Sequence, residues 1–128
     1  MDIVSALFAE NINLRPMPGP STRIDLTGIM FSMAAPSPPP VTITPHLVVL
    51  VRCRPDEDGQ GILEVVFRDE SGEQVARNAQ PFSVEPGKFT YRLVRGELTY
   101  EKLGTIEAHC RVGQGQVTAV PLTLLAPE

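Results

Sequence analysis

Apolar and polar residues alternate along much of this chain, and two neighbouring segments in its middle show the alternation most clearly. They are residues 47–54 and 62–68. Because side chains alternate between the two faces of a β-strand, each segment places an almost wholly apolar set of residues on one face. The residues on these two faces are Leu47, Val49, Val51, Cys53, Leu63, Val65 and Phe67. The pattern predicts two strands that pack against a hydrophobic core.

The acidic, glycine-bearing loop 55–61 joins these segments and predicts a β-hairpin. A register that pairs Val51 with Val65 also places Arg52 opposite Glu64, a favourable pair of opposite charges on the outer face. A slip by one residue would turn Arg52 into the core. We therefore expect this register to be strongly specified.

The outer face of the same pair is also apolar, and its residues form the predicted interaction surface. They are Val48, Leu50, Ile62 and Val66. A sheet face in contact with water would be more polar, so something should cover this one. The cover is either the chain itself, through a terminus or a long loop, or a second subunit, because symmetric dimers are the commonest oligomers.

The amino-terminal segment, residues 1–14, is compatible with two structures. Its apolar residues Ile3, Val4, Leu7 and Phe8 have the spacing of a helical stripe. The same residues also alternate along an extended chain, and short apolar runs do not discriminate between the two. We favour a strand, and a helix is the alternative.

Shorter alternating stretches follow, separated by turns rich in proline and glycine. They are residues 22–33, 74–80, 88–95, 105–112 and 116–125. Within them, Gly28 suggests a bulge, a bend or a close backbone approach. In residues 88–95 we expect Phe89, Tyr91 and Leu93 to point inward, and we expect the polar stretch 74–80 to lie at a sheet edge.

These seven to eight short strands predict an all-β fold. The specific expectation is an antiparallel β-sandwich, immunoglobulin-like, with a closed barrel as the alternative. The length of 128 residues suits a single domain over residues 1–128, with residues 34–45 as a proline-rich crossover within it. The 13 prolines and 10 glycines favour turns over helices.

The net charge and the amino-terminal sequence limit the possible partners and cellular location of the protein. The formal net charge of −4 argues against a general nucleic-acid binder, which needs a basic surface. No basic residue precedes the first apolar run, so it does not resemble a secretory signal. No apolar run approaches the roughly 20 residues that span a membrane. We expect a cytoplasmic protein.

Cys53 and Cys110 both fall on predicted inward faces, and their separation is compatible with the bridge between the sheets of immunoglobulin domains. The tryptophan that usually accompanies that bridge is absent. Reduced core cysteines are the expectation for a cytoplasmic chain, and a bridge is the alternative.

The loop 55–61 also resembles the beginning of an EF-hand. Asp56, Asp58 and Gln60 take the places of its first three oxygen ligands, and Gly61 that of its invariant glycine. The twelfth position, normally a bidentate glutamate, is Phe67. A solvated loop is therefore expected, and a calcium site of another geometry is the alternative.

Several segments resemble an uncharacterised bacterial family of small β-sandwich proteins known only as a domain of unknown function. The strand at residues 23–29 (RIDLTGI) resembles its GKLNIIGI strand, with Arg23 where the family has lysine. Other matching segments are residues 47–52, 66–75 (VFRDESGEQV) and 98–122, in which Ile106 replaces an aromatic residue. The resemblance implies a sandwich and a strand at the amino terminus, and it implies no activity.

The combined pattern favours a non-catalytic interaction module that self-associates as a homodimer or docks on a partner protein. A ligand- or calcium-binding module using loop 55–61 is one alternative, and an enzyme of a type not revealed by any motif is another. The sequence contains no Ser–His–acid arrangement, phosphate loop or dinucleotide fingerprint. We expect no cofactor, no catalytic residue, no nucleic acid and no membrane partner.

Overall fold

A computed structural model describes residues 1–19 and 22–128, and the described residues fold into β-strands and loops without a helix. The strands are β1 (Asp2–Pro16), β2 (Thr22–Met30), β3 (Ser32–Ala34), β4 (Val41–Ile43), β5 (His46–Arg52), β6 (Gln60–Arg68), β7 (Gln74–Ser83), β8 (Phe89–Arg95), β9 (Leu98–Tyr100), β10 (Gly104–Val112) and β11 (Thr118–Leu125). The all-β prediction is confirmed. The eleven strands exceed the seven to eight expected because β3, β4 and β9 are only three residues long.

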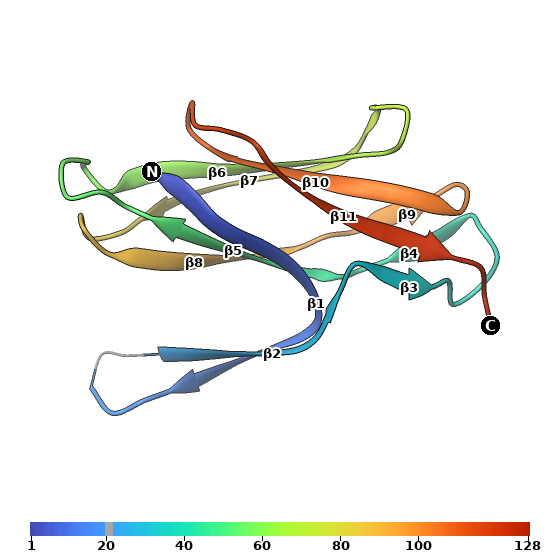
Figure 1. Cartoon of the computed structure of the whole chain (residues 1–128), viewed down its shortest axis with the longest axis horizontal. Coiled ribbons are helices and arrows are strands. Elements are labelled where there is room, and N and C mark those ends of the chain that lie inside the picture. The colour runs from blue at the N-terminus through green and yellow to red at the C-terminus, as the bar shows by residue number, and fades with distance from the viewer. Residues whose placement is uncertain (20–21) are drawn as a thin grey trace.

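The strands form two larger sheets and one small ribbon (Figure 1). Sheet A has the order β2-β1-β5-β8, and sheet B has the order β3-β11-β10-β6-β7. Strands β4 and β9 pair with each other. Neighbouring strands are antiparallel throughout, except that β3 runs parallel to β11.

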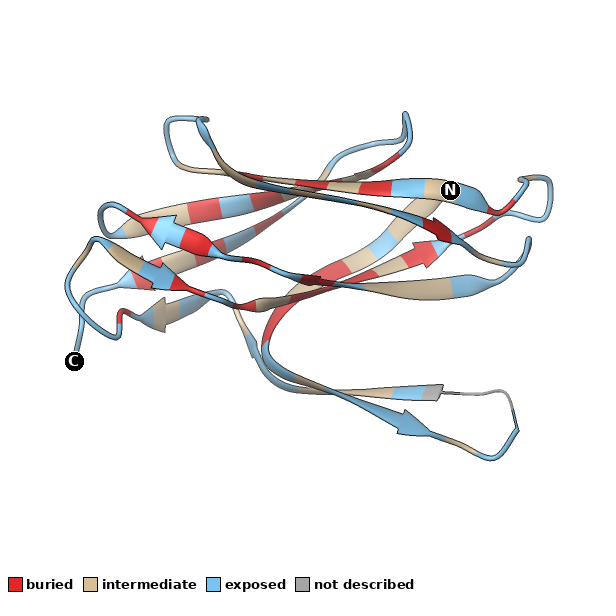
Figure 2. Ribbon diagram, turned by 180° about the vertical axis from the view of Figure 1, so that it is seen from behind, coloured by how far each residue is buried: buried red, intermediate tan, exposed pale blue. Residues whose placement is uncertain are grey.

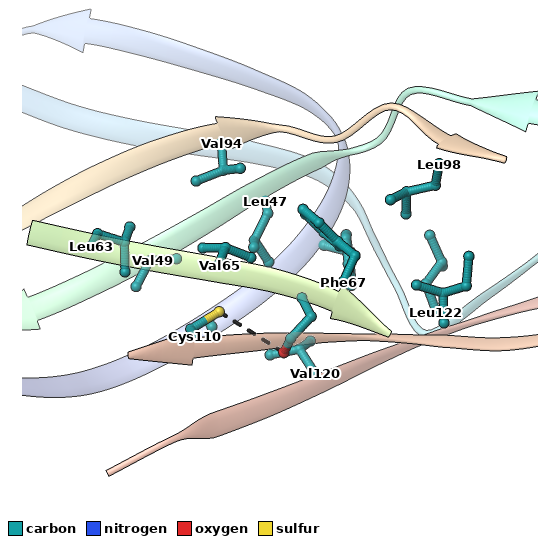
Figure 3. Close-up of a cluster of buried hydrophobic side chains, with 14 of the residues drawn as sticks. Leu47, Val49, Leu63, Val65, Phe67, Val94, Leu98, Cys110, Val120 and Leu122 are labelled. Atoms are coloured by element: carbon teal, nitrogen blue, oxygen red, sulfur yellow. Dashed lines mark hydrogen bonds between the residues drawn. The ribbon is translucent and has the colours of Figure 1, made fainter. Parts of the chain in front are cut away.

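One hydrophobic cluster joins the inner faces of the two sheets (Figure 3). Its most deeply buried members are Phe8, Leu47, Val49, Val51, Leu63, Val65, Phe67, Val94, Leu98, Ala108, Cys110, Leu122 and Leu124. The chain places them there because each strand alternates apolar and polar positions. Tyr100 enters the same cluster from β9, and its hydroxyl donates a hydrogen bond to the Leu122 carbonyl oxygen at 2.7 Å. Burial raises the pKa of that hydroxyl.

The predicted central hairpin is wrong, although its inward residues are correct. Strand β5 pairs with β1 and β8 in sheet A, whereas β6 pairs with β7 and β10 in sheet B. The buried faces of β5 and β6 therefore belong to opposite layers of the core. The loop between them crosses from one sheet to the other, and Cys53 and Gly59 in it are tied by backbone hydrogen bonds to residues 84–88.

The expected pair of Arg52 and Glu64 is consequently absent. Glu64 instead accepts a hydrogen bond from Arg77 Nη2 at 2.7 Å, and Arg111 lies 3.9 Å from its other oxygen. The Arg77 guanidinium holds the pKa of the Glu64 carboxyl below its usual value. In sheet A, Arg52 lies between Asp2 of β1 and Phe89 of β8.

Strand β8 presents the opposite face from the one predicted. Val94 lies opposite Leu47 and is buried in the core, with an exposed fraction of 2%. Phe89 and Leu93 are exposed, and Tyr91 shares their face. Arg92 therefore points toward the inner side, where its Nε donates to Gln80 Oε1 at 2.8 Å and its guanidinium lies over the Phe82 ring.

Several other predictions are confirmed. The amino-terminal segment is a strand, β1, and β7 is an edge strand of sheet B. Strands β10 and β11 alternate as expected, and their buried residues are Ile106, Ala108, Cys110, Val112, Val120, Leu122 and Leu124. Gly28 has φ +66° and lies so close to Glu10 that an added Cβ would be 2.6 Å from that residue's Cδ.

The two cysteines are buried and free, so the expectation of reduced core cysteines is confirmed. Cys110 lies in the core cluster, where burial raises the pKa of its thiol to about 12. Among residues 1–19 and 22–128 there is no helix with the length and apolar character needed to cross a membrane.

Candidate interaction surface

Strand β1 is fifteen residues long and changes partners near its middle. Up to Ala9 it pairs with β5, and from Phe8 onward it pairs with β2. Residues 10–16 and 22–28 therefore form a two-stranded ribbon, here called the arm, that bends out of the plane of sheet A and runs back alongside it (Figure 1). Gly28 lies at its base, where positive φ bends β2 in a way that only glycine adopts readily.

The arm has one apolar and one polar face. Ile12 lies opposite Leu26 and Leu14 lies opposite Ile24, so these four residues share a face. The other face carries Asn11, Asn13, Arg15, Arg23, Asp25 and Thr27. Figure 2 shows that the arm is exposed or only partly buried over most of its length.

A bidentate ion pair joins the two strands on the polar face of the arm. Arg15 donates to the two carboxylate oxygens of Asp25, at 2.9 Å and 3.0 Å. The Arg15 guanidinium lowers the pKa of the Asp25 carboxyl. Arg15 also lies directly opposite Arg23, so the arm places two like charges side by side with one carboxylate near them.

The outer face of sheet A is apolar along the three strands β1, β5 and β8. Val48 lies between Leu7 and Leu93, and Leu50 lies opposite Tyr91. The neighbouring inner positions on β5 belong to the core, so these side chains point away from it. This surface is therefore a second apolar face of the sheet.

A cleft of about 300 Å³ separates the arm from the outer face of sheet A. The residues that line it are Ser5, Leu7, Arg23, Ile24, Leu26, Val48 and Leu50. The arm thus folds back over β1 and β5 with its apolar residues toward them. Apart from Ser5 and Arg23, the lining is hydrophobic.

The arm covers only part of the apolar surface. Val48 has an exposed fraction of 3% although it lies outside the main core cluster, which shows that chain on the outer side protects it. On β8, Leu93 keeps 37% and Phe89 keeps 67% of its surface exposed. The uncovered part of the outer face therefore lies along β8.

The four residues of the predicted interaction surface do not lie together. Val48 and Leu50 are on the outer face of sheet A, whereas Ile62 and Val66 are on β6, on the outer face of sheet B. Ile62 is exposed and Val66 is partly buried there. The separation follows from the two strands lying in different sheets.

Sequence reasoning missed the contribution of β8 and of the arm. The alternation of Phe89, Tyr91 and Leu93 is visible in the sequence, but it predicts the inner face for them. The arm's pairs of Ile12 with Leu26 and Leu14 with Ile24 appear only once β1 and β2 are paired with each other. The alternating apolar residues of β8 and of the arm are the sequence signal from which an outward apolar face could have been predicted.

The acidic loop does not bring together the side chains that the calcium-binding alternative requires. Asp58 Oδ1 accepts a hydrogen bond from the Gln60 amide at 2.9 Å, so it stabilises the loop's own turn. Asp56 is exposed. Across residues 1–19 and 22–128, no three His, Cys, Asp or Glu side chains approach closely enough to hold a metal ion.

Glu57, in the same loop, acts as a structural anchor. Its carboxylate accepts hydrogen bonds from the amino group of Met1 and, at 2.9 Å, from the Arg54 amide. These donors lower the pKa of the Glu57 carboxyl, the amino group contributing most. Asp2 pairs with Arg54 at 3.0 Å, so the start of β1 is tied to this loop by two contacts.

Comparison of the sequence with models of known protein families finds no match, and comparison with curated proteins finds none either. Among the surfaces of the molecule, the arm and the outer face of sheet A carry exposed apolar side chains, including Leu14, Phe89 and Leu93.

Proposed function

We propose that this chain is a non-catalytic interaction module that self-associates, or docks on a partner protein, through the outer face of sheet A. The observation that carries this proposal is the row of apolar side chains on β8 that the arm leaves exposed beside Val48 and Leu50. Single exposed hydrophobic residues are normal on protein surfaces, but contiguous apolar patches mark interaction sites.

The lining of the cleft supports binding over catalysis. Its side chains are apolar except for one serine and one arginine. General acid–base or nucleophilic chemistry requires a base beside a nucleophile or acid, and such a pair is not part of this lining. The apolar lining suits the burial of another hydrophobic surface, which is the dominant favourable term in most protein association.

We also infer an immunoglobulin-like sandwich and a relation to the bacterial β-sandwich family that the sequence resembles. Two mainly antiparallel sheets around one core support the first inference. The segments that carry the resemblance fall largely on strands, including residues 23–29 in β2 and 47–52 in β5, which supports the second. The two free, buried thiols suit a cytoplasmic location.

The test compares two substitutions of exposed apolar residues on opposite sides of the molecule. Leu93→Gln removes an apolar contact from the outer face of sheet A, and Ile62→Gln makes the matched change on sheet B. We expect Leu93→Gln to weaken self-association about tenfold in sedimentation equilibrium, because about 1.4 kcal/mol of apolar burial is lost. Ile62→Gln should leave it unchanged.

Two outcomes would contradict the proposal. If the unmodified chain stays monomeric at high micromolar concentration, self-association is wrong. If Ile62→Gln weakens association and Leu93→Gln does not, the interaction uses sheet B instead. Circular dichroism and melting curves for both variants establish that each is folded before the comparison is made.

A further inference from the structure

The free edge of β2 is a place where another strand can add. One edge of this nine-residue strand pairs with β1, and in the described part of the chain nothing pairs with the other. An unpaired edge presents a row of N–H and C=O groups that can pair with a further strand. The free edge of β8 differs, because Gln80 Nε2 donates to the Leu93 carbonyl oxygen at 3.3 Å and so occupies part of it.

Residues of β2 also line the cleft beneath the arm. Arg23, Ile24 and Leu26 of β2 lie along it, together with Val48 and Leu50 of β5. Strand β2 therefore lies beside the outer face of sheet A, and its edge away from β1 is the one at which a further strand would pair.

The arm also has a physical reason to gain strands. A two-stranded ribbon is only marginally stable in water, and three or more strands with a hydrophobic face are far more stable. The arm's apolar face is only partly covered, since Leu14 keeps 43% of its surface exposed. An added strand would extend the ribbon and enlarge its cover over the outer face of sheet A.

The charges on β2 indicate which strand would pair with its free edge. Strand β2 carries the run Arg23, Ile24, Asp25. In an antiparallel pair of two β2 strands with Ile24 at the twofold axis, Arg23 of each copy lies opposite Asp25 of the other. Opposite charges directly across a strand pair stabilise it. Within one copy Arg23 lies opposite Arg15, so the second copy supplies a carboxylate directly across from Arg23.

We propose that two copies of this chain associate by antiparallel pairing of their β2 edges, with Ile24 at the twofold axis. The two arms then form one four-stranded sheet whose apolar face covers the outer faces of both copies of sheet A. This inference rests on the proposed function and specifies its partner and register. The interface is isologous, as a twofold dimer requires.

Charge reversal followed by mixing tests the register. Arg23→Glu places a carboxylate opposite Asp25 of the second copy, and Asp25→Arg places a guanidinium opposite Arg23. Each variant alone should dimerise about tenfold or more weakly in sedimentation equilibrium, because two attractive pairs become repulsive. An equimolar mixture restores attraction between opposite charges in the heterodimer, so dimerisation should return to nearly the level of the unmodified chain.

Arg77→Glu provides a matched control. It reverses an exposed arginine of an ion pair on sheet B, away from the arm, and should leave the dimer unchanged. Circular dichroism and urea unfolding of each variant separate a loss of dimerisation from a loss of folding.

The remaining outcomes overturn the inference in distinguishable ways. If the two reversals leave dimerisation unchanged while Leu93→Gln weakens it, the β2 pairing is wrong and the proposed function stands. If both reversals weaken the dimer but the mixture does not recover, the Ile24 register is wrong. An unmodified chain that remains monomeric overturns both this inference and self-association, and of the proposed function it leaves only docking on a partner protein.

Discussion

Gly59 occupies a position where only a hydrogen atom can serve as a side chain. Its φ is +81°, and an added Cβ would lie 2.0 Å from the Val84 carbonyl oxygen. The Val84 amide also donates to the Gly59 carbonyl oxygen at 2.8 Å. This contact ties the loop after β5 to the loop after β7, so the crossing between the two sheets depends on it.

We expect Gly59→Ala to lower the free energy of unfolding by about 2–4 kcal/mol, through positive φ and displacement of the Val84 backbone. Gly72→Ala is the matched control, because Gly72 has φ +85° and open space around its Cβ position. It should cost about 1 kcal/mol. Urea unfolding measures the free energy of unfolding of both variants. Equal decreases would show that the close contact with Val84 does not contribute to the cost of Gly59→Ala.

The two thiols give a second prediction at this scale. Cys53 and Cys110 are exposed by 1% and 0%, and a thiol pKa of about 12 at Cys110 leaves almost no reactive thiolate at neutral pH. We expect a chromogenic disulfide reagent to modify neither cysteine in the native chain and both after unfolding in guanidinium. Rapid modification of the native chain would contradict the buried placement, and no modification after unfolding would indicate a bridge.

At the scale of elements, alternation identifies which residues face inward but not which strands are neighbours. The apolar faces of β5 and β6 are predictable because Val49 and Phe67 are part of a strict period of two. The same alternation is expected for strands paired in one sheet and for strands facing each other across a core. The short loop between β5 and β6 favours a hairpin. In the structure, backbone hydrogen bonds join Cys53 and Gly59 of this loop to residues 84–88, and the two strands face each other across the core.

Strand β8 shows where alternation fails altogether. Phe89, Tyr91 and Leu93 are more apolar than Thr90, Arg92 and Val94, so hydrophobicity alone selects the wrong face. Two features of the structure explain the inversion. The apolar side chains of the arm lie beside the outer face of sheet A, and Gln80 with Phe82 accommodates Arg92 at the inner edge. Neither feature is visible within the strand itself.

At the scale of the whole molecule, the candidate surface is predictable only in part. Val48 and Leu50 can be identified from the sequence because they are apolar at outward positions. The arm that covers them cannot, because it requires β1 to leave β5 and pair with β2 near Glu10. Gly28 is the one feature of the local sequence that indicates this change of partner, because its positive φ bends β2 at the base of the arm.

Stability toward acid is also a property of the whole molecule, because five carboxyl groups have a lowered pKa in the folded chain. They are Asp2, Asp25, Glu57, Glu64 and Asp69. The main causes are hydrogen bonds from Arg54, Arg15, the Met1 amino group, Arg77 and Ser71 respectively. A pKa lower in the folded than in the unfolded chain means that the unfolded chain binds protons first on acidification.

These groups therefore stabilise the fold above the ordinary carboxyl values of 3.8 and 4.5, and their contribution disappears as the pH falls through the lower folded values. We expect the melting temperature to be nearly constant from about pH 7 to 5 and to fall steadily below about pH 4.5. Because none of the five residues is buried, added salt should reduce the loss. Asp69→Asn, which removes one titrating group, should melt lower at neutral pH and show a shallower decline. A melting temperature unchanged down to about pH 3 would contradict the assigned ion pairs and hydrogen bonds.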